Sequence, residues 1–223
     1  MLTLHHLENS RSQRILWLLE ELELEYEIKL YKRDSKTNLA PPELIEIHPL
    51  GKSPVITDGD LTIAESGAII QYLLENHADG RFCPEMGTDA WREYTYWMHF
   101  AEGTLMPYLV FKLVFHKVET APLPFFVKPI AKGISGKVNR TFIMPNIERN
   151  LAFIESSLEG KEWFVDDRLS GADFQMSFPL EAAAARANFD AHPNIKAYIK
   201  RFQARDAYKR ALEKGGPYNL SMG

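Results

Sequence analysis

The chain has 223 residues, of which 45% are apolar and 25% charged, a composition typical of globular proteins with one large or two ordinary domains. Its 26 basic and 30 acidic side chains give a net charge of −4, so the chain as a whole has no electrostatic attraction to nucleic acid. The single cysteine, Cys83, excludes an internal disulfide framework and a cysteine-based zinc site.

Neither the start of the sequence nor its apolar stretches indicate targeting or membrane insertion. Residues 1–13 lack a basic region followed by a long apolar segment. The most apolar later stretch, 105–115, contains Lys112 and is too short to span a bilayer. His5 and His6 have no partner at metal-ligand spacing. We therefore expect a cytoplasmic protein without a metal or a permanently bound cofactor.

The first 76 residues alternate between strand and helix patterns. The predicted strands are 2–5, 26–31, 55–57 and 61–63, and the predicted helices lie between the first two strands, at 41–47 and at 66–76. The first helix carries Ile15, Leu18 and Leu22 on one face, and an Asp-Gly turn joins the last two strands as a hairpin. This order, βαβαββα, predicts an α/β domain over residues 1–78 with a parallel pair of strands and an antiparallel edge.

From about residue 88 the pattern is helical throughout, and residues 77–88 form the predicted linker. The predicted helices are 89–118 with Pro107 as a point of bending, 145–158 with an earlier start as an alternative, 170–188, 193–204 and 206–214. Ser170 and Asp173 have the spacing of a capping box, which marks the start of the third of these helices. We predict a second, all-helical domain over residues 89–223.

Two helix starts are candidate ligand sites. Residues 8–14, ENSRSQR, follow the first strand, and a helix N-terminus there favours an anion such as a thiolate. Because this stretch contains no cysteine, such a thiolate would have to come with a substrate; the alternative is that Ser10 or Ser12 only caps the helix. At the second start, Ser66 and the helix N–H groups could hold a carboxylate and Glu65 an ammonium group. The plainer interpretation is a simple cap beside a solvated glutamate.

Pro54 precedes the apolar strand 55–57. Proline cannot donate to a sheet ladder, so it fits the first position of a strand. The approach through Gly51, Lys52 and Ser53 is either a plain tight turn or a turn with a cis peptide bond.

Together these segments resemble the cytosolic glutathione transferases. The motifs are S-R-x-x-R at 10–14, H-P-L-G-K-S-P at 48–54 and A-E-S-G at 64–67, in this order, and the resemblance covers essentially the whole chain. The chain is most similar to fungal and bacterial members with a serine after the first strand. The resemblance implies a thioredoxin-like N-terminal domain followed by an all-α C-terminal domain.

The resemblance also implies a role for each residue of these motifs. Ser10 would hydrogen-bond the sulfur of glutathione and stabilise its thiolate, with Arg11 and Ser12 as helpers, and which hydroxyl faces the sulfur stays open. The implied glutathione-binding residues are His48 and Lys52 for the glycyl carboxylate, Ser53 for the cysteinyl backbone, Pro54 as the cis residue, and Glu65 and Ser66 for the γ-glutamyl end.

A hydrophobic electrophile, the implied second substrate, would bind between the domains beside helix 89–118. The aromatic and apolar candidates for that pocket are Tyr94, Trp97, Met98, Phe100, Tyr108 and Phe111, which could equally be core residues. Glu102 would contact glutathione across the interface of the homodimer that the resemblance implies, or would simply be solvated.

The absence of a cysteine at residues 9–12 discriminates between chemistries of this fold. Dithiol exchange, or a mixed disulfide with glutathione, would need a cysteine there, so conjugation is favoured, with a peroxide as an alternative second substrate. We interpret Cys83 as an inert surface or packing residue. The competing functions are a non-catalytic glutathione-binding protein and an interaction module on the same scaffold.

One segment has no place in a minimal transferase. Residues 120–147 include no acidic side chain but carry Lys128, Lys132, Lys137 and Arg140 together with Phe125, Phe126 and four prolines. Two hypotheses follow: a flap over the electrophile pocket, or a contact with an anionic surface. The alternative is a solvated loop between two helices.

Overall fold

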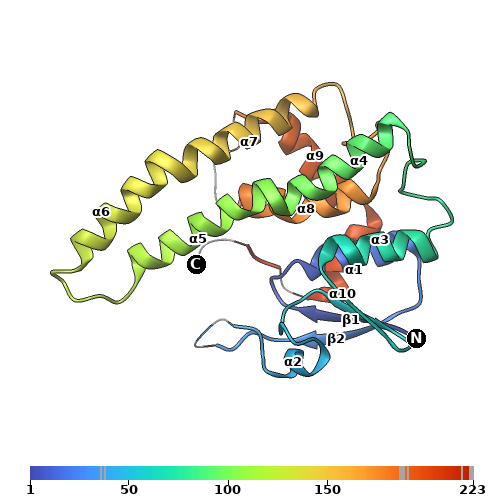
Figure 1. Cartoon of the computed structure of the whole chain (residues 1–223), viewed down its shortest axis with the longest axis horizontal. Coiled ribbons are helices and arrows are strands. Elements are labelled where there is room, and N and C mark those ends of the chain that lie inside the picture. Colours follow the sequence, from blue (N-terminus) through green and yellow to red (C-terminus); the bar gives the residue numbers. More distant parts are fainter. Residues whose placement is uncertain (36, 38, 186–188, 190, 217, 221–223) are drawn as a thin grey trace.

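The computed structural model describes all residues except 36, 38, 186–188, 190, 217 and 221–223 (Figure 1). In the N-terminal part the strands are β1 (Leu2–Leu7), β2 (Glu27–Tyr31), β3 (Val55–Asp58) and β4 (Leu61–Ala64), and the helices are α1 (Ser12–Leu22), α2 (Glu43–Ile47) and α3 (Ser66–His77). The sheet has the order β2-β1-β3-β4, with β1 and β2 parallel and the other pairs antiparallel. This confirms the predicted βαβαββα fold class.

The sheet separates two apolar layers. On one face, Leu4 and Ile56 join the main core with the apolar sides of α1 and α3. On the other face, Leu7 and Tyr31 pack against Leu44 of the short helix α2. Figure 1 shows α1 and α3 above the sheet and α2 below it. The carboxyl end of β1, where the candidate site begins, is therefore held from both sides.

The remaining elements are helical. They are α4 (Asp89–Phe100), α5 (Met106–Thr120), α6 (Lys128–Val138), α7 (Met144–Ser157), α8 (Gly171–Ala184), α9 (Pro193–Ala204) and α10 (Asp206–Gly215), with π-helical segments η1 (Ala101–Leu105) and η2 (Asn139–Ile143). Among the described residues, no helix is long and apolar enough to cross a membrane.

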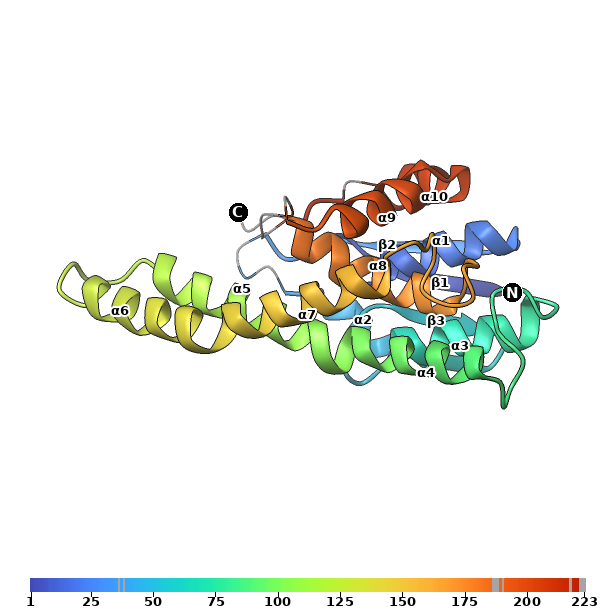
Figure 2. The same cartoon turned by 90° about the horizontal axis from the view of Figure 1, so that it is seen from above.

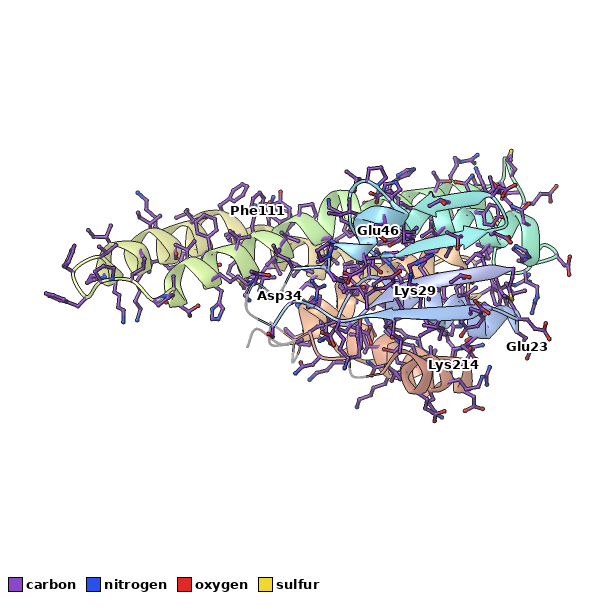
Figure 3. All side chains as sticks on the ribbon, turned by 90° about the horizontal axis from the view of Figure 1, so that it is seen from below. Glu23, Lys29, Asp34, Glu46, Phe111 and Lys214 are labelled. Atoms are coloured by element: carbon purple, nitrogen blue, oxygen red, sulfur yellow. The ribbon has the colours of Figure 1, made fainter. Side chains whose placement is uncertain are left out.

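Two long helical rods, α4–η1–α5 and α6–η2–α7, run side by side, and their α5 and α6 ends extend beyond the rest of the molecule (Figures 1, 2 and 3). Each contains one π-helical turn directly before a Met-Pro pair. The Met106 N–H donates to the Ala101 carbonyl and the Met144 N–H to the Asn139 carbonyl, one residue further back than in an α-helix. The wider turn accommodates the ring of the following proline, which would clash in a regular helix.

These rods correct the expectation for residues 120–147. The helix expected at 145–158 is α7, and α6 and η2 extend the same rod back to Lys128, so most of the segment is helical rather than a loop. None of its residues lines the larger cavity, so it is not a flap over that cavity. The first rod also continues to Thr120.

Helix α8 lies at the centre of the helical part. Nearly all its residues are buried, and its N-terminus has the predicted capping box, with the Asp173 carboxylate accepting from the Ser170 backbone N–H at 2.7 Å. The prediction placed the end of this helix near Asn188. Helix α8 ends at Ala184, and residues 186–188 lie outside the described part of the chain.

Candidate active site

The site is built around the loop between β1 and α1. Asn9 adopts a positive φ of 50°, a conformation that asparagine tolerates well, and the chain then turns into the helix at Ser12. The Ser12 backbone N–H donates to the Ser10 hydroxyl oxygen at 3.2 Å. Ser10 lines the large cavity described below, whereas the Ser12 side chain is fully buried. Of these two serines, therefore, only Ser10 lies at the wall of the cavity.

The two hydroxyls form a chain of hydrogen bonds that ends on His6. The Ser10 and Ser12 oxygens are 2.8 Å apart, and the Ser12 oxygen is 2.9 Å from His6 Nδ1. Burial lowers the pKa of His6 to about 4, partly opposed by a hydrogen bond to the Gly215 backbone, so the ring is neutral at pH 7. A neutral imidazole has one N–H, which serves the Gly215 contact, and Nδ1 then accepts the Ser12 proton.

Below this loop, a buried arginine connects the two halves of the molecule. Arg14 has no exposed surface on its side chain; it donates to the Ser66 hydroxyl at 3.0 Å and to the Gln175 carbonyl at 2.6 Å, and it forms an ion pair with Glu102. Arg11 donates to the other oxygen of Glu102 at 3.0 Å. Glu102 is thus not a solvated glutamate.

The charges of this cluster support each other. Burial alone would raise the pKa of Glu102, but the charges and hydrogen bonds of Arg14 and Arg11 hold that pKa below its ordinary value. Burial lowers the pKa of Arg14, and Glu102 opposes this shift. An arginine stays protonated at any working pH, so Glu102 remains an anion between two cations.

The loop before β3 has the predicted backbone. The Ser53–Pro54 peptide bond is cis. The Ser53 hydroxyl donates to the His5 carbonyl at 2.8 Å and accepts from the Leu7 N–H at 3.2 Å, which fastens this loop to β1. Ser53 is therefore fixed beside the Ser10 loop.

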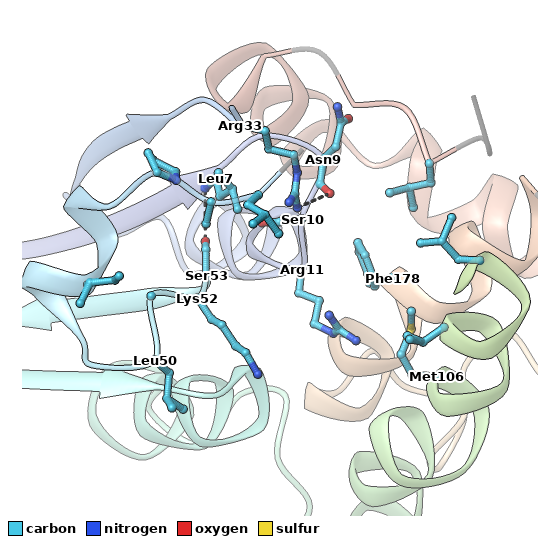
Figure 4. Close-up of a pocket in the computed structure, with 18 residues that line it drawn as sticks. Leu7, Asn9, Ser10, Arg11, Arg33, Leu50, Lys52, Ser53, Met106 and Phe178 are labelled. Atoms are coloured by element: carbon cyan, nitrogen blue, oxygen red, sulfur yellow. Dashed lines mark hydrogen bonds between the residues drawn. The ribbon is translucent and has the colours of Figure 1, made fainter. Parts of the chain in front are cut away.

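Two adjoining cavities lie along these loops. The larger, of about 550 Å³, is lined by Ser10, Arg11, Lys52 and Ser53 on one side (Figure 4). Its opposite, apolar wall comes from Met106, Val110 and Leu113 of α5 with Phe178 and Leu220. The smaller, of about 200 Å³, is lined by the predicted residues His48, Lys52, Ser53, Pro54, Glu65 and Ser66 together with Arg11 and Glu102. The structure thus brings together every predicted glutathione-binding residue.

The predicted electrophile residues lie elsewhere. Tyr94, Trp97 and Phe100 are at most 5% exposed and belong to the main core. Tyr108 and Phe111 contact Phe142 of the neighbouring rod. None of the five lines the larger cavity, nor does Met98. The physical reason is that α4 turns its aromatic stripe toward α8 and the cavity begins only at α5.

Sequence reasoning also missed several residues of the site. Arg14 appeared only as the last letter of S-R-x-x-R, and its burial was not foreseen. The Leu220 side chain lines the larger cavity, and the Asn219 N–H donates to the Asn9 side-chain oxygen at 2.6 Å. No local pattern signals that a chain segment 210 residues away returns to the first loop.

The described residues hold no group of three histidine, cysteine or acidic side chains that could bind a metal ion. Cys83 is partly buried against the main core, and burial together with the charge of Glu75 raises the pKa of its thiol. This shift is opposite to that of reactive cysteines.

A thioredoxin-like domain followed by a helical domain, with a cysteine-free serine loop facing a peptide-sized cavity, defines the class of glutathione-dependent transferases. Residues 1–75 match the model of the glutathione S-transferase N-terminal domain, and residues 143–206 match that of the C-terminal domain. The chain belongs to the glutathione S-transferase family and is an enzyme of it.

Relatives match over essentially the whole chain. Glutathione S-transferase 1 of Saccharomyces cerevisiae is 34% identical over 96% of this chain and 95% of its own length. Glutathione S-transferase 3 of Schizosaccharomyces pombe is 35% identical over 100% of this chain and 91% of its own. A solved glutathione S-transferase from Actinobacillus pleuropneumoniae superposes with a TM-score of 0.81 at 38% identity, covering 100% of this chain and 95% of that one.

A more distant structure shows the same fold. Ure2p5 from Phanerochaete chrysosporium, cocrystallised with 1-(S-glutathionyl)-2,4-dinitrobenzene, has a TM-score of 0.72 at 20% identity, over 96% of this chain and 94% of its own.

Proposed function

We propose that this enzyme joins the sulfur of glutathione to hydrophobic electrophiles, and that Ser10 stabilises the thiolate. The observation that carries the proposal is the position of Ser10, which lines the larger cavity just before the start of α1 in a loop without cysteine. The thiolate forms the new sulfur–carbon bond, the leaving group departs with its electron pair, and the thiol proton passes to solvent.

The other roles follow the lining of the smaller cavity. Lys52 and His48 would bind the glycyl carboxylate, and Ser53 would pair its backbone with the cysteinyl unit beside Pro54. Glu65 and Ser66 would hold the γ-glutamyl end. Glu102 also lines the smaller cavity, where Arg11 and Arg14 of the same chain hold its carboxylate. This position favours a contact with glutathione bound to its own subunit over a contact with glutathione bound to a partner subunit. Arg11 would help by holding this carboxylate.

The magnitudes are sufficient for this chemistry. Lowering the pKa of a thiol by about two units requires about 2.7 kcal/mol of preference for the thiolate. A hydrogen bond to a charged group contributes about 1.5–3 kcal/mol and a helix N-terminus about 0.3–1 kcal/mol. One hydroxyl and one helix end therefore account for the activation, once the Ser10 proton, which the Ser12 oxygen accepts in the free protein, turns to the bound sulfur.

The apolar wall indicates the second substrate. Met106, Val110, Leu113 and Phe178 would contact an apolar electrophile next to the sulfur, in place of the aromatic residues expected from the sequence.

We further propose that the protein works as a homodimer in the cytoplasm, with residues 1–78 and 89–223 as its domains. Reduction of organic hydroperoxides by the same thiolate is a second reaction to assay.

The test compares Ser10→Ala with Ser12→Ala. We use 1-chloro-2,4-dinitrobenzene as the electrophile and calorimetry for glutathione affinity. Ser10→Ala should lower kcat/KM at pH 6.5 by about 10–100-fold, with a much smaller change in glutathione Kd, because the hydroxyl acts mainly on the thiolate. Ser12→Ala should lower kcat/KM by a smaller factor than Ser10→Ala does. If Ser10→Ala conjugates at the wild-type rate across pH 6–8, the thiolate is stabilised by Ser12 or by another group.

The same protein samples separate the competing functions. Retention on immobilised glutathione without turnover of any electrophile or hydroperoxide would show a non-catalytic binding protein. Absence of retention would favour an interaction module. Turnover with retention supports the proposal.

A further inference from the structure

The outer parts of the two rods, α5 in one and α6 with η2 in the other, form an arm that covers residues 106–143. The arm ends in an apolar tip, residues 121–127, which connects α5 to α6. The tip has the sequence APLPFFV, in which no side chain is polar. Phe125 is 85% exposed and Phe126 65% exposed, and their rings pack on each other with centroids 5.5 Å apart. Neither belongs to the described hydrophobic clusters of the core. Large aromatic side chains exposed in this way mark an interaction site.

The tip is the part of the molecule farthest from the cavities. In Figures 1 and 2 the loop between α5 and α6 stands at the extreme end of the arm, away from the sheet and from α8–α10. No residue of 121–147 lines the larger cavity. A planar surface could therefore meet the tip without covering the site.

The arm carries charge of the sign opposite to that of the whole protein. Residues 106–143 contain six lysine or arginine side chains and one carboxylate, a net charge of +5, whereas the chain carries −4 and the remainder therefore −9. Lys117, Lys128 and Lys132 lie within about two helical turns of the tip and are exposed. The tip is thus an apolar end surrounded by cations.

Four of the seven backbone units of the tip either lack an N–H group or have it paired within the tip. Pro122 and Pro124 have no N–H to satisfy. The N–H groups of Leu123 and Val127 donate to the carbonyls of Ala121 and Pro124 at 2.8 and 2.9 Å. Backbone groups paired in this way enter hydrocarbon at a lower cost than unpaired ones.

We propose that the tip inserts into the surface of an anionic lipid bilayer, with Phe125 and Phe126 in the apolar boundary and the flanking lysines at the headgroups. The combination of buried apolar side chains and cations is what gives peripheral proteins affinity for such surfaces. Ile130 and Ile134, which lie four residues apart and are 62% and 56% exposed, extend the apolar surface along α6. Aliphatic side chains of this kind favour lipid over nucleic acid, whose bases stack on aromatic rings.

The experiment is flotation of the full-length protein with vesicles of phosphatidylcholine alone or with about 30 mol% phosphatidylserine, a surface that attracts basic segments. The wild type should float with the phosphatidylserine vesicles and much less with the neutral ones. Phe125→Ser/Phe126→Ser should lose most of this binding. Lys128→Glu/Lys132→Glu should weaken it by about tenfold or more, since each lysine near the surface contributes about fivefold. Conjugation activity should stay at the wild-type level in both variants.

Two controls match these variants. Met86→Ser removes another exposed apolar side chain, 76% exposed, from outside the arm. Lys200→Glu/Lys209→Glu makes the same change in net charge on α9 and α10, where both lysines are exposed. Both controls should bind vesicles as the wild type does, which would show that position rather than net charge decides the binding.

Three results would overturn the proposal. The first is equal flotation of the wild type and both tip variants. The second is a change in oligomeric state of the phenylalanine variant, measured by light scattering, without loss of vesicle binding, because the tip would then contact a second copy. The third is binding to duplex or single-stranded nucleic acid, lost in the tip variants, without binding to phosphatidylserine vesicles.

Discussion

At the scale of single residues, the first loop combines a serine that lines the cavity with groups that are buried beneath it. Ser10 lines the cavity, while Ser12 and His6 are buried behind it and joined to it by hydrogen bonds. Ser12 and His6 fix the position of Ser10, but the His6 ring is buried, and burial disfavours its protonated form. This arrangement should make the protein sensitive to acid.

The pH dependence of stability follows from His6. Its pKa is about 4 in the folded protein and 6.5 in the unfolded chain, so between these values the unfolded state binds more protons. Stability contributed by the neutral ring is therefore present above pH 6.5 and is lost as the pH falls toward 4, with a loss of about 2 kcal/mol by pH 5. His6→Gln cannot titrate, so its deficit relative to wild type should shrink by this amount between pH 7 and pH 5 in urea unfolding.

Ser12→Ala is the control for that measurement. It keeps the titrating ring but removes a hydrogen bond that favours its neutral form, so it should keep most of the wild-type pH slope. If His6→Gln also keeps the wild-type slope, acid sensitivity arises from other groups.

At the scale of elements, the sequence predicted the helices and strands whose periodicity and end signals agree. The capping box of α8, the Asp-Gly hairpin and the proline before β3 each have a local cause that can be read along the chain. Helix α6 has none: Gly133 and Gly136 lower its helix propensity, and it is held by packing Ala131 and Ser135 against its neighbours.

The cavity wall was missed for a related reason. Periodicity shows which residues share a face of a helix but not which element that face will meet. The aromatic stripe of α4 was therefore assigned to the cavity, which α5 lines instead. The residues predicted to bind glutathione line one cavity, and each stands in a short motif that can be read locally, whereas Arg14, Leu220 and Phe178 depend on contacts across the whole chain.

Two glycines allow opposite predictions for one substitution. A Cβ on Gly171, at the start of α8, would lie 2.7 Å from the Tyr94 hydroxyl and 2.8 Å from Leu74 Cδ1, both in the core. Gly171→Ala should therefore lower the free energy of unfolding by about 1–3 kcal/mol. Gly133, in the interior of α6, has no atom within 4 Å of such a Cβ, and Gly133→Ala should raise it by about 0.5–1 kcal/mol.

Urea unfolding of the two variants measures both effects. A stabilised Gly171→Ala protein would mean that α3 and α4 yield easily at this contact. A destabilised Gly133→Ala protein would mean that the arm helix does not persist in solution.

At the scale of the whole molecule, the sheet and the helices share one core. Trp17 of α1 has its ring centroid 4.5 Å from that of Phe174, 5.3 Å from that of Phe202 and 5.7 Å from that of Tyr208. On the same side, Glu20 of α1 accepts from Arg210 of α10 at 2.9 Å. The N-terminal part therefore buries its first helix in the helical part.

We expect the two parts to unfold together. Far-UV circular dichroism and tryptophan fluorescence should give coincident urea transitions, because exposing Trp17 requires the loss of α8–α10 packing. Trp17→Phe should shift both transitions to lower urea by the same amount. Two separated transitions would show that the α/β part and the helical part are stable independently.

The uneven charge of the arm has a consequence that does not require contact. A molecule with +5 at one end and −9 elsewhere is a large electric dipole, and near a negatively charged plane it experiences a torque. The arm would turn toward the plane before arrival and the acidic body away from it. Within a Debye length of about 8 Å at physiological salt this rotation is strong, and raising the salt removes it. The encounter itself would thus be oriented, with the tip of the arm rather than the acidic body meeting the plane first.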